Sequence, residues 1–185
     1  MKRLIWAIAI LGATISVCFG QVAGPTTNQQ PGPGQYGLSN EVCVTPTITA
    51  SQYSANNSLG GVMYFPYLFG ARGSGVIQSV RITFKSAQTV EFDVSILTGN
   101  PVYSSMLDKA TPAIALQDVL LVTPTIKLTN NSSTLGTETV YGADAIGRAI
   151  NKAPYGVYAL VTTTGTPTPA STTDMQLCIG ALSDN

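Results

Sequence analysis

The chain has 185 residues, with nine basic and nine acidic side chains that give a formal net charge of zero at pH 7. Charged residues make up only 10% of it, and they form no basic patch that would attract a nucleic acid. The absence of His excludes Ser-His and Cys-His nucleophile pairs and removes the commonest transition-metal ligand. We therefore expect no cofactor and no bound transition metal, and carboxylate pairs are the catalytic groups that remain.

Residues 1–20 have the pattern of an export signal. Two basic residues precede an apolar run, and Cys18 and Gly20 place small side chains at the −3 and −1 positions of a cleavage site before Gln21. The run is short for a membrane span, which needs about 20 apolar residues. We predict an exported protein, in the periplasm, on the cell surface or secreted, without stable membrane insertion after cleavage. A retained N-terminal anchor is the alternative.

Residues 21–41 contain Pro, Gly, Gln and Asn with few apolar side chains. Such a segment cannot bury enough surface to offset its ordering entropy, so we predict a flexible tether. Cleavage after Gly20 would leave seven basic and nine acidic residues, a net charge of −2. Residues 42–185 are then one domain, which is long enough for a real core.

The first strands of this domain are expected over residues 42–50 and 62–71. Pro46 has no N–H, which makes the first of them an edge strand or a bulged one. The second, VMYFPYLFGA, is rich in aromatic residues and bounded by glycines, which is typical of a buried strand. Core packing is favoured for its aromatic residues; the alternative is a binding stripe made by Tyr64, Tyr67 and Phe69.

The clearest alternation lies within residues 75–101, where two runs with apolar residues at every second position flank a short polar break. We predict a hairpin that places Phe84 beside Phe92. Its outer face would then set Arg81 and Lys85 near the carboxylates of Glu91 and Asp93. These two carboxylates could serve a glycosidase or a calcium site, but a solvated strand face explains them as well and is favoured.

The rest of the chain continues as short strands and turns. We expect a helix over 111–119, strands over 120–128, 138–141, 155–161 and 174–182, a helical turn over 143–150, and polar loops over 129–137 and 162–173. About eight strands with one or two short helices indicate an all-β domain, a β-sandwich of jelly-roll type.

Cys43 and Cys178 are the cysteines that remain after removal of the signal. They lie in the first and last predicted strands, which are often neighbours in a sandwich. Each has apolar neighbours in sequence, so both thiols should point outward and can meet only if the two strands pair directly. Because export implies an oxidising compartment, we predict a disulfide between them. Two unrelated thiols are the alternative.

Short motifs in a characteristic order and spacing run from residue 48 to residue 182. They are Tyr53-Ser54-Ala55 with Gly60-Gly61, residues 73–80 (GSGVIQSV), residues 97–101 (LTGNP), residues 155–158 (YGVY), Gly165-Thr166-Pro167 and residues 171–174 (STTD). In these the chain resembles a family of small proteins encoded in tailed-bacteriophage genomes and associated with virion structure. The export signal and the tether depart from that family.

The resemblance implies a β-rich, non-enzymatic building block located in a virion, with other virion or cell-surface proteins as partners, and it allows a homo-oligomer. Together with the signal, it predicts a phage-type structural or surface-attachment protein. The alternative is an exported carbohydrate-binding or carbohydrate-cleaving β-sandwich with glycans as partners. Such a domain would use the pair of carboxylates at 91 and 93, or a candidate binding loop with Thr164, Thr166, Thr168 and Asp174.

Overall fold

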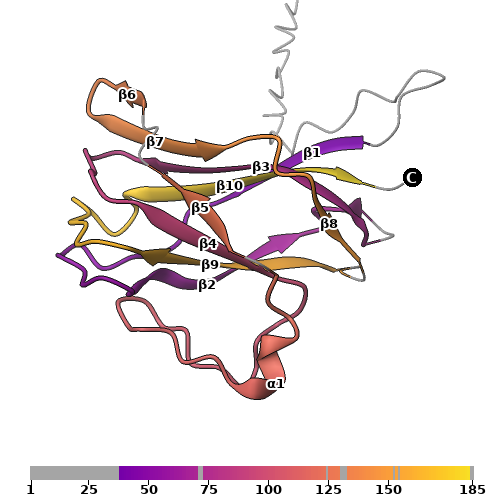
Figure 1. Ribbon diagram of the computed structural model, residues 1–185. Coiled ribbons are helices and arrows are strands. Elements are labelled where there is room, and N and C mark those ends of the chain that lie inside the picture. Colours follow the sequence, from indigo (N-terminus) through magenta and orange to yellow (C-terminus); the bar gives the residue numbers. More distant parts are fainter. Residues whose placement is uncertain are drawn as a thin grey trace, which may run out of the picture.

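The computed structural model describes residues 38–70, 73–123, 125–129, 133–151, 153 and 155–183. These residues form two packed antiparallel sheets, which confirms the predicted β-sandwich (Figure 1). The first sheet has the order β1 (Leu38–Val44), β10 (Met175–Ser183), β3 (Gly75–Phe84), β7 (Glu138–Ala143) and β6 (Ser133–Leu135), and β8 (Arg148–Ile150) also pairs with β3. The second has the order β2 (Ser58–Pro66), β9 (Gly156–Thr163), β4 (Phe92–Leu97) and β5 (Ile126–Leu128).

The core lies between the sheets and follows the alternation in the sequence. Buried apolar side chains occupy alternate positions in β4, in most of β9 and β10, and in β3 from Val80 to Phe84. Phe84 of β3 stacks on Phe92 of β4 with ring centroids 5.1 Å apart, and Tyr141 of β7 meets Phe92 edge-on at 5.0 Å. Such aromatic pairs add roughly 0.5–1.5 kcal/mol each beyond the burial of their area.

The hairpin predicted within residues 75–101 is wrong. β3 pairs with β10 and β7 in one sheet, and β4 pairs with β9 and β5 in the other. Phe84 and Phe92 do lie side by side, but they meet across the core and not along a shared ladder. Alternation shows that a strand has an apolar face and leaves open which strand lies beside it.

The charge pairing predicted for that hairpin is wrong for the same reason. Arg81 donates to Glu41 of β1, with 2.7 Å between the guanidinium nitrogen and the carboxylate oxygen. Asp93 stands opposite Lys127 of β5 and Thr162 of β9 in register. Of the two carboxylates assigned to Arg81 and Lys85, Asp93 belongs to the other sheet and Glu91 precedes its strand β4.

Three other predicted elements also differ. The helix expected over 111–119 is a single turn, α1 (Leu116–Val119), because Ala115 before it is extended and gives no side-chain cap. The helical turn expected over 143–150 ends in strand β8, and the strand expected over 120–128 begins only at Ile126. In residues 148–150, helical propensity gave way to pairing with β3.

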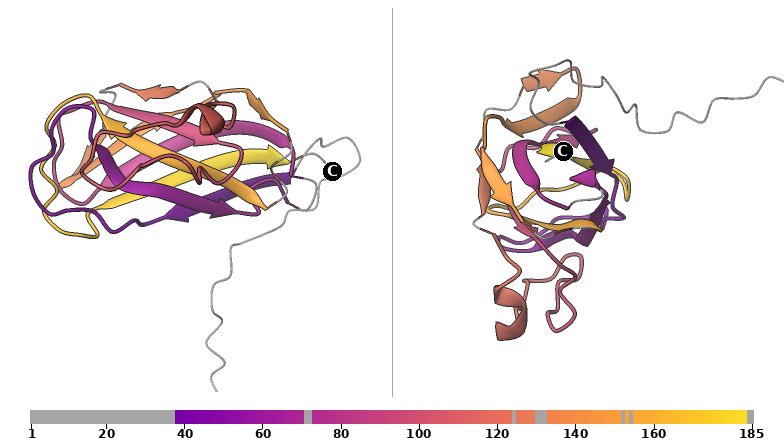
Figure 2. Two further views of the ribbon diagram at one scale, coloured as in Figure 1. Left: turned by 90° about the horizontal axis from the view of Figure 1, so that it is seen from below. Right: turned by 90° about the vertical axis from the view of Figure 1, so that its right-hand side faces the viewer.

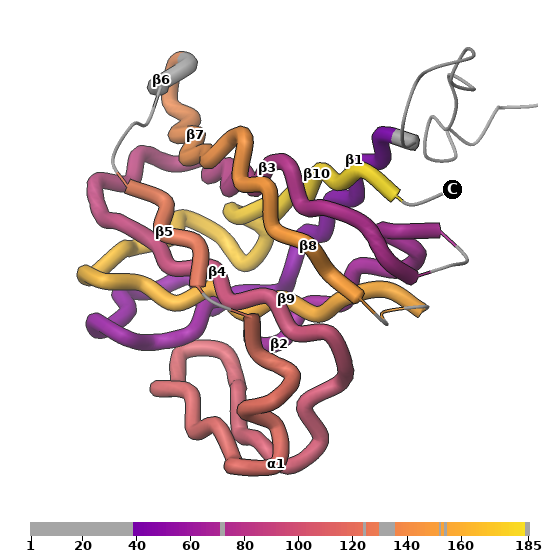
Figure 3. Tube along the Cα trace, turned by 45° about the vertical axis from the view of Figure 1, so that its right-hand side comes forward, coloured from indigo at the N-terminus to yellow at the C-terminus, as the bar shows by residue number. Residues whose placement is uncertain are grey.

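The first and last strands frame the domain. β1 begins at Leu38, so residues 38–41, predicted as part of the tether, pair with β10 instead. The start of β1, the end of β10 and the end of β2 lie at the same end of the sandwich (Figure 3). The predicted export signal and residues 21–37 of the predicted tether lie outside the described residues. No helix among the described residues has the length and hydropathy that crossing a bilayer requires.

Candidate functional site

The largest departure from a plain sandwich is an excursion of the chain between β4 and β5, residues 98–123. It carries α1 and stands off the sheet formed by β2, β9 and β4 (Figures 1 and 2). Its inner side covers part of the outer face of that sheet, where Met106 packs with Leu97 and Leu160 in a second small core. This sheet is therefore apolar on both faces over part of its area.

Asp108 anchors the excursion to the sandwich. One carboxylate oxygen accepts bonds from the Thr49 amide (2.9 Å) and the Thr49 hydroxyl (2.6 Å). The other accepts from the Tyr53 hydroxyl (2.8 Å) and the Gly60 amide (2.7 Å). Hydrogen bonds to a charged group contribute roughly 1.5–3 kcal/mol each, so this carboxylate holds one end of the excursion in place.

Asp118 braces the excursion from within. Although it lies in the single turn α1, its side chain is buried, and its carboxylate accepts from the Tyr103 amide (2.9 Å) and the Ser104 hydroxyl (2.6 Å). The Ser104 hydroxyl oxygen in turn accepts from the Ala115 amide at 3.0 Å. These bonds fix the two arms of the excursion against each other, so what it presents outward has a defined shape.

The outward side of the excursion is apolar. Of the ten large apolar side chains exposed in the described part of the chain, seven lie on it, and Leu116 and Leu120 are 82% and 90% exposed. We call these seven the crest: Val102, Tyr103, Leu107, Ile114, Leu116, Val119 and Leu120. The bonds of Asp118 place the arm with Tyr103 beside α1, so the crest crosses both arms. Exposed apolar patches of this kind mark interaction sites.

Few charges accompany the crest. The excursion holds three ionisable side chains other than tyrosine. Asp118 is buried, Asp108 is used in the anchor, and Lys109 donates to the Ser51 hydroxyl at 2.6 Å. The crest therefore suits a partner surface that is also apolar and uncharged.

The other three exposed apolar side chains are tyrosines at the end of the same sheet. Tyr64 of β2 stands opposite Tyr158 of β9, and their ring centroids are 4.8 Å apart. The Tyr67 amide donates to the Tyr155 carbonyl at 3.2 Å, and the Tyr64 hydroxyl donates to the same carbonyl. Partial burial, and then the nearby Tyr158 and Tyr67, raise the pKa of Tyr64. We call Tyr64, Tyr67, Tyr155 and Tyr158 the tyrosine cluster.

The binding stripe considered for Tyr64, Tyr67 and Phe69 is thus divided. Phe69 is part of the core, as core packing predicts, whereas Tyr64 and Tyr67 are exposed. Core packing is therefore wrong for these two tyrosines. The strand expected over 155–161 had Tyr155 on one side and Tyr158 on the other, and only the pairing of β9 with β2 brings the Tyr158 ring to Tyr64.

The candidate binding loop is closely bound to the segment before β4. Thr164 donates from its amide to the Glu91 carbonyl (3.1 Å), and the Thr168 amide donates to the Gln88 side chain (3.2 Å). Asp174 is buried and accepts from the Ser86 amide (2.9 Å) and from the Ala170 amide (2.8 Å). Asp174 therefore stabilises the loop from inside. Ligand binding by Thr164, Thr166 and Thr168, which are exposed, stays a prediction.

The carboxylates at 91 and 93 are less closely associated than the sequence suggested. Glu91 precedes β4 and is exposed, whereas Asp93 lies within β4 and is partly buried. Asp93 faces Lys127 and Thr162 of the neighbouring strands in register. A solvated strand face with a cross-strand charge describes this arrangement.

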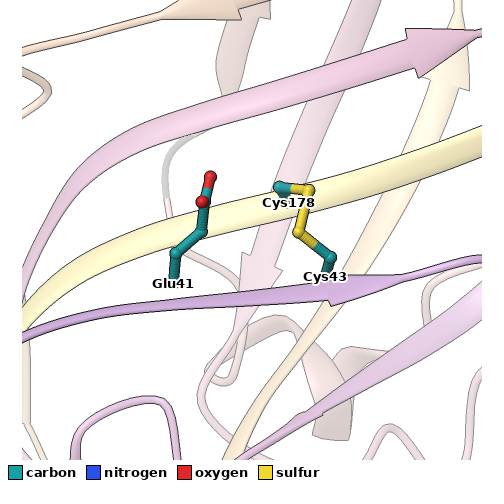
Figure 4. Close-up of side chains that lie close together, drawn as sticks. All are labelled: Glu41, Cys43 and Cys178. Atoms are coloured by element: carbon teal, nitrogen blue, oxygen red, sulfur yellow. A yellow bond between two sulfur atoms is a disulfide. The ribbon is translucent and has the colours of Figure 1, made fainter. Parts of the chain in front are cut away.

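Cys43 and Cys178 stand directly opposite each other in β1 and β10, as predicted, and the structure joins them in a disulfide (Figure 4). Their sulfur atoms and a carboxylate oxygen of Glu41 lie within 4.8 Å of one another. The thiolate is the form of cysteine that binds metals, and Glu41 is paired with Arg81. This cluster therefore joins the first and last strands, and in the disulfide form it has no thiolate to offer a metal ion.

No profile of a known protein family matches the sequence, and no curated protein matches it. Among solved structures, the chain is similar to the crystal structure of tomato aspermy virus, with a TM-score of 0.39 and 13% identity over 89% of this chain and 86% of that one. It is also similar to the structure of cocksfoot mottle virus, with a TM-score of 0.31 and 9% identity over 100% and 97% of the two chains. Both TM-scores are below 0.5.

Proposed function

We propose that this protein is an exported, non-enzymatic structural or surface-attachment protein of phage type that assembles through its crest. The observation that carries the proposal is the gathering of seven exposed apolar side chains on one braced excursion. Leaving these side chains in water has a cost of roughly 1.5–3 kcal/mol for each fully exposed one, relative to burial. Rigid bracing by Asp108 and Asp118 reduces the entropy that a partner must overcome on binding.

The partner that the crest fits best is a second copy of this chain. The seven crest side chains carry no charge. Of the ionisable side chains of the excursion, Asp118 is buried, Asp108 is bonded in the anchor, and the exposed Lys109 donates to the Ser51 hydroxyl. A surface that meets itself about a twofold axis needs only to be self-complementary, and two apolar uncharged surfaces fulfil this. One contact between two crests should be reversible and should gain strength in an array, because buried area alone does not set affinity.

Sedimentation equilibrium of the exported protein tests this proposal. We expect a reversible monomer–dimer equilibrium in the micromolar to millimolar range, and we expect Leu116→Ser with Leu120→Ser to shift it to monomer. Both side chains are exposed, so the variant should unfold at the same urea concentration as the parent protein. A matched control is Thr164→Ser with Thr166→Ser, which changes an exposed loop away from the crest.

A protein that stays monomeric at every concentration would contradict the proposal, and so would a dimer that the crest variant leaves unchanged. Location is tested separately by fractionation: the protein should be found outside the cytoplasm, beginning at or near Gln21. Intact Met1 in a cytoplasmic fraction would overturn the exported part of the proposal.

A further inference from the structure

We propose that the tyrosine cluster is a binding site for an uncharged saccharide. The proposal concerns a surface separate from the crest and stands on its own observations. The cluster gathers four of the eight tyrosines of the chain at one end of the sheet formed by β2 and β9. Tyr67 and Tyr155 are 65% and 76% exposed. Tyr64 of β2 and Tyr158 of β9 are a cross-strand pair whose rings are in contact on one face of the sheet.

The chemistry of the cluster points to a ligand with apolar faces and a polar rim. A tyrosine ring offers an apolar face for contact and a hydroxyl that donates and accepts hydrogen bonds at its tip. A pyranose ring has the matching character, since its axial C–H groups form apolar faces and its hydroxyls lie around the edge. Leucine or phenylalanine at these positions would fit a purely apolar partner equally well, whereas four tyrosines add four hydroxyls.

The surroundings of the cluster point to a neutral ligand. In the described parts of the two segments that carry it, residues 58–70, 153 and 155–163, tyrosine is the only ionisable residue. Among these residues a sugar acid, a phosphate or a charged peptide would find no countercharge. An uncharged sugar loses no ionic hydration on binding and therefore needs no countercharge.

The cluster is also held in position before any ligand arrives. The Tyr64 hydroxyl donates to the Tyr155 carbonyl, which fixes the Tyr64 ring beside Tyr158. Tyr67 has a φ of 51°, a left-handed conformation that is uncommon for a bulky residue. The Asn40 side chain donates to the carbonyls of Tyr67 and Leu68, each at 3.4 Å, and supports this turn. Strained backbone that neighbouring groups hold in place is frequent at binding sites, and a preformed site binds more tightly.

Isothermal titration calorimetry with neutral hexasaccharides tests the proposal. The probes are β-1,4-linked glucose, β-1,4-linked N-acetylglucosamine and α-1,4-linked glucose, each titrated into the exported protein. We expect saturable binding of at least one of them, and we expect Tyr67→Ala to weaken it about tenfold or more. Tyr64→Phe removes only a hydroxyl and keeps the ring, so it should fold normally and bind more weakly than the parent protein. Tyr103→Ala, an exposed tyrosine on the crest, is the matched control and should bind as the parent does.

Several outcomes would overturn this assignment. They are the absence of saturable binding to all three probes, equal loss of binding in Tyr67→Ala and Tyr103→Ala, and unchanged affinity in both cluster variants. Saturable binding of a decaproline peptide without binding of any saccharide would assign the cluster to a peptide and would overturn the ligand class. The crest variant, Leu116→Ser with Leu120→Ser, keeps all four tyrosines of the cluster. The sedimentation test of the crest and the saccharide titrations can therefore fail independently of each other.

Discussion

Gly156 opens β9 opposite Pro66 of β2. Its φ is 125°, and a Cβ added to it would lie 2.1 Å from the carbonyl oxygen of Phe65. A side chain at this position would therefore have to push apart the strands that carry Tyr64 and Tyr158. The residue thus supports the tyrosine cluster without contacting a ligand.

We predict that Gly156→Ala lowers the free energy of unfolding by at least about 2 kcal/mol, measured by urea denaturation. Gly142→Ala is the matched control, because a Cβ at Gly142 would meet no heavy atom within 4 Å. It should change the free energy of unfolding by no more than about 0.5–1 kcal/mol, in the stabilising direction. Similar losses in the two variants would contradict the close approach of β2 and β9.

At the scale of elements, the excursion is held to the sandwich by a small core and by hydrogen bonds. It has one helical turn, α1, packs Met106 against the sheet, and bonds through the carboxylate of Asp108 and through backbone pairing with Ser58 of β2. Removal of this carboxylate would leave donors of Thr49, Tyr53 and Gly60 without their acceptor. Buried donors without a partner have a cost of roughly 1–3 kcal/mol each.

We therefore expect Asp108→Ala to lower the free energy of unfolding by about 2–4 kcal/mol in urea denaturation. The same variant should become sensitive to limited proteolysis within residues 98–123, because the anchor of the excursion is lost. Asp144→Ala, an exposed aspartate between β7 and β8, is the control and should stay within about 0.5 kcal/mol of the parent protein. Unchanged stability in Asp108→Ala would contradict the anchoring role.

At the scale of the whole molecule, the disulfide ties together the two ends of the described chain. It joins residues 135 positions apart and lies between the edge strand β1 and its neighbour β10. Closing a loop of this length stabilises the folded state by roughly 5 kcal/mol in the chain-entropy treatment, and measured values are usually 2–4. The disulfide thus links the stability of the fold to the oxidising compartment implied by the predicted export signal.

Non-reducing peptide mapping of the exported protein should recover one peptide pair joined through Cys43 and Cys178. The double variant Cys43→Ala with Cys178→Ala should unfold with a free energy lower by about 2–5 kcal/mol. A reducing agent should destabilise the parent protein by a similar amount and leave the double variant unaffected. Alkylation of free thiols at both positions in the exported protein would refute the bond.

Two buried tyrosines give the whole fold an alkaline limit. Burial, and then the hydrogen bond to Asp108, raise the pKa of Tyr53, and burial raises the pKa of Tyr141. A pKa raised in the folded state means that the unfolded chain ionises first, near pH 10. The unfolded state then binds fewer protons than the folded state, so stability falls as pH increases.

We expect the free energy of unfolding to be independent of tyrosine ionisation below about pH 9 and to fall above about pH 10. Urea denaturation at a series of pH values measures this. Tyr141→Phe should reduce the slope above pH 10, because the variant has one buried phenol fewer, whereas Tyr103→Phe on the exposed crest should leave the slope unchanged. Equal slopes in all three proteins would show that burial of the phenol does not set the alkaline limit.

The sequence by itself determined the class of the fold and the outward position of both cysteines. Alternation of apolar and polar residues is a local property, because successive side chains of a strand point to opposite faces. It therefore predicted strands whose bounds are near those of β3, β4, β9 and β10, and it predicted correctly that Phe84 and Phe92 are buried. The tyrosines of YFPY and YGVY were also visible, but each run by itself fitted a core strand as well as a binding surface.

Only the tertiary structure decided which strand lies beside which. Pairing depends on backbone hydrogen bonds that almost any strand can offer, so alternation could not tell a hairpin from two strands in opposite sheets. The tertiary structure also placed Arg81 beside Glu41 and buried Asp174 and Asp118. It exposed Leu116, because α1 is a single turn and is too short for a helical pattern to indicate which face packs on the core. The crest and the tyrosine cluster join residues distant in sequence, and the fold alone brings them together, because their contacts are made between elements and not within them.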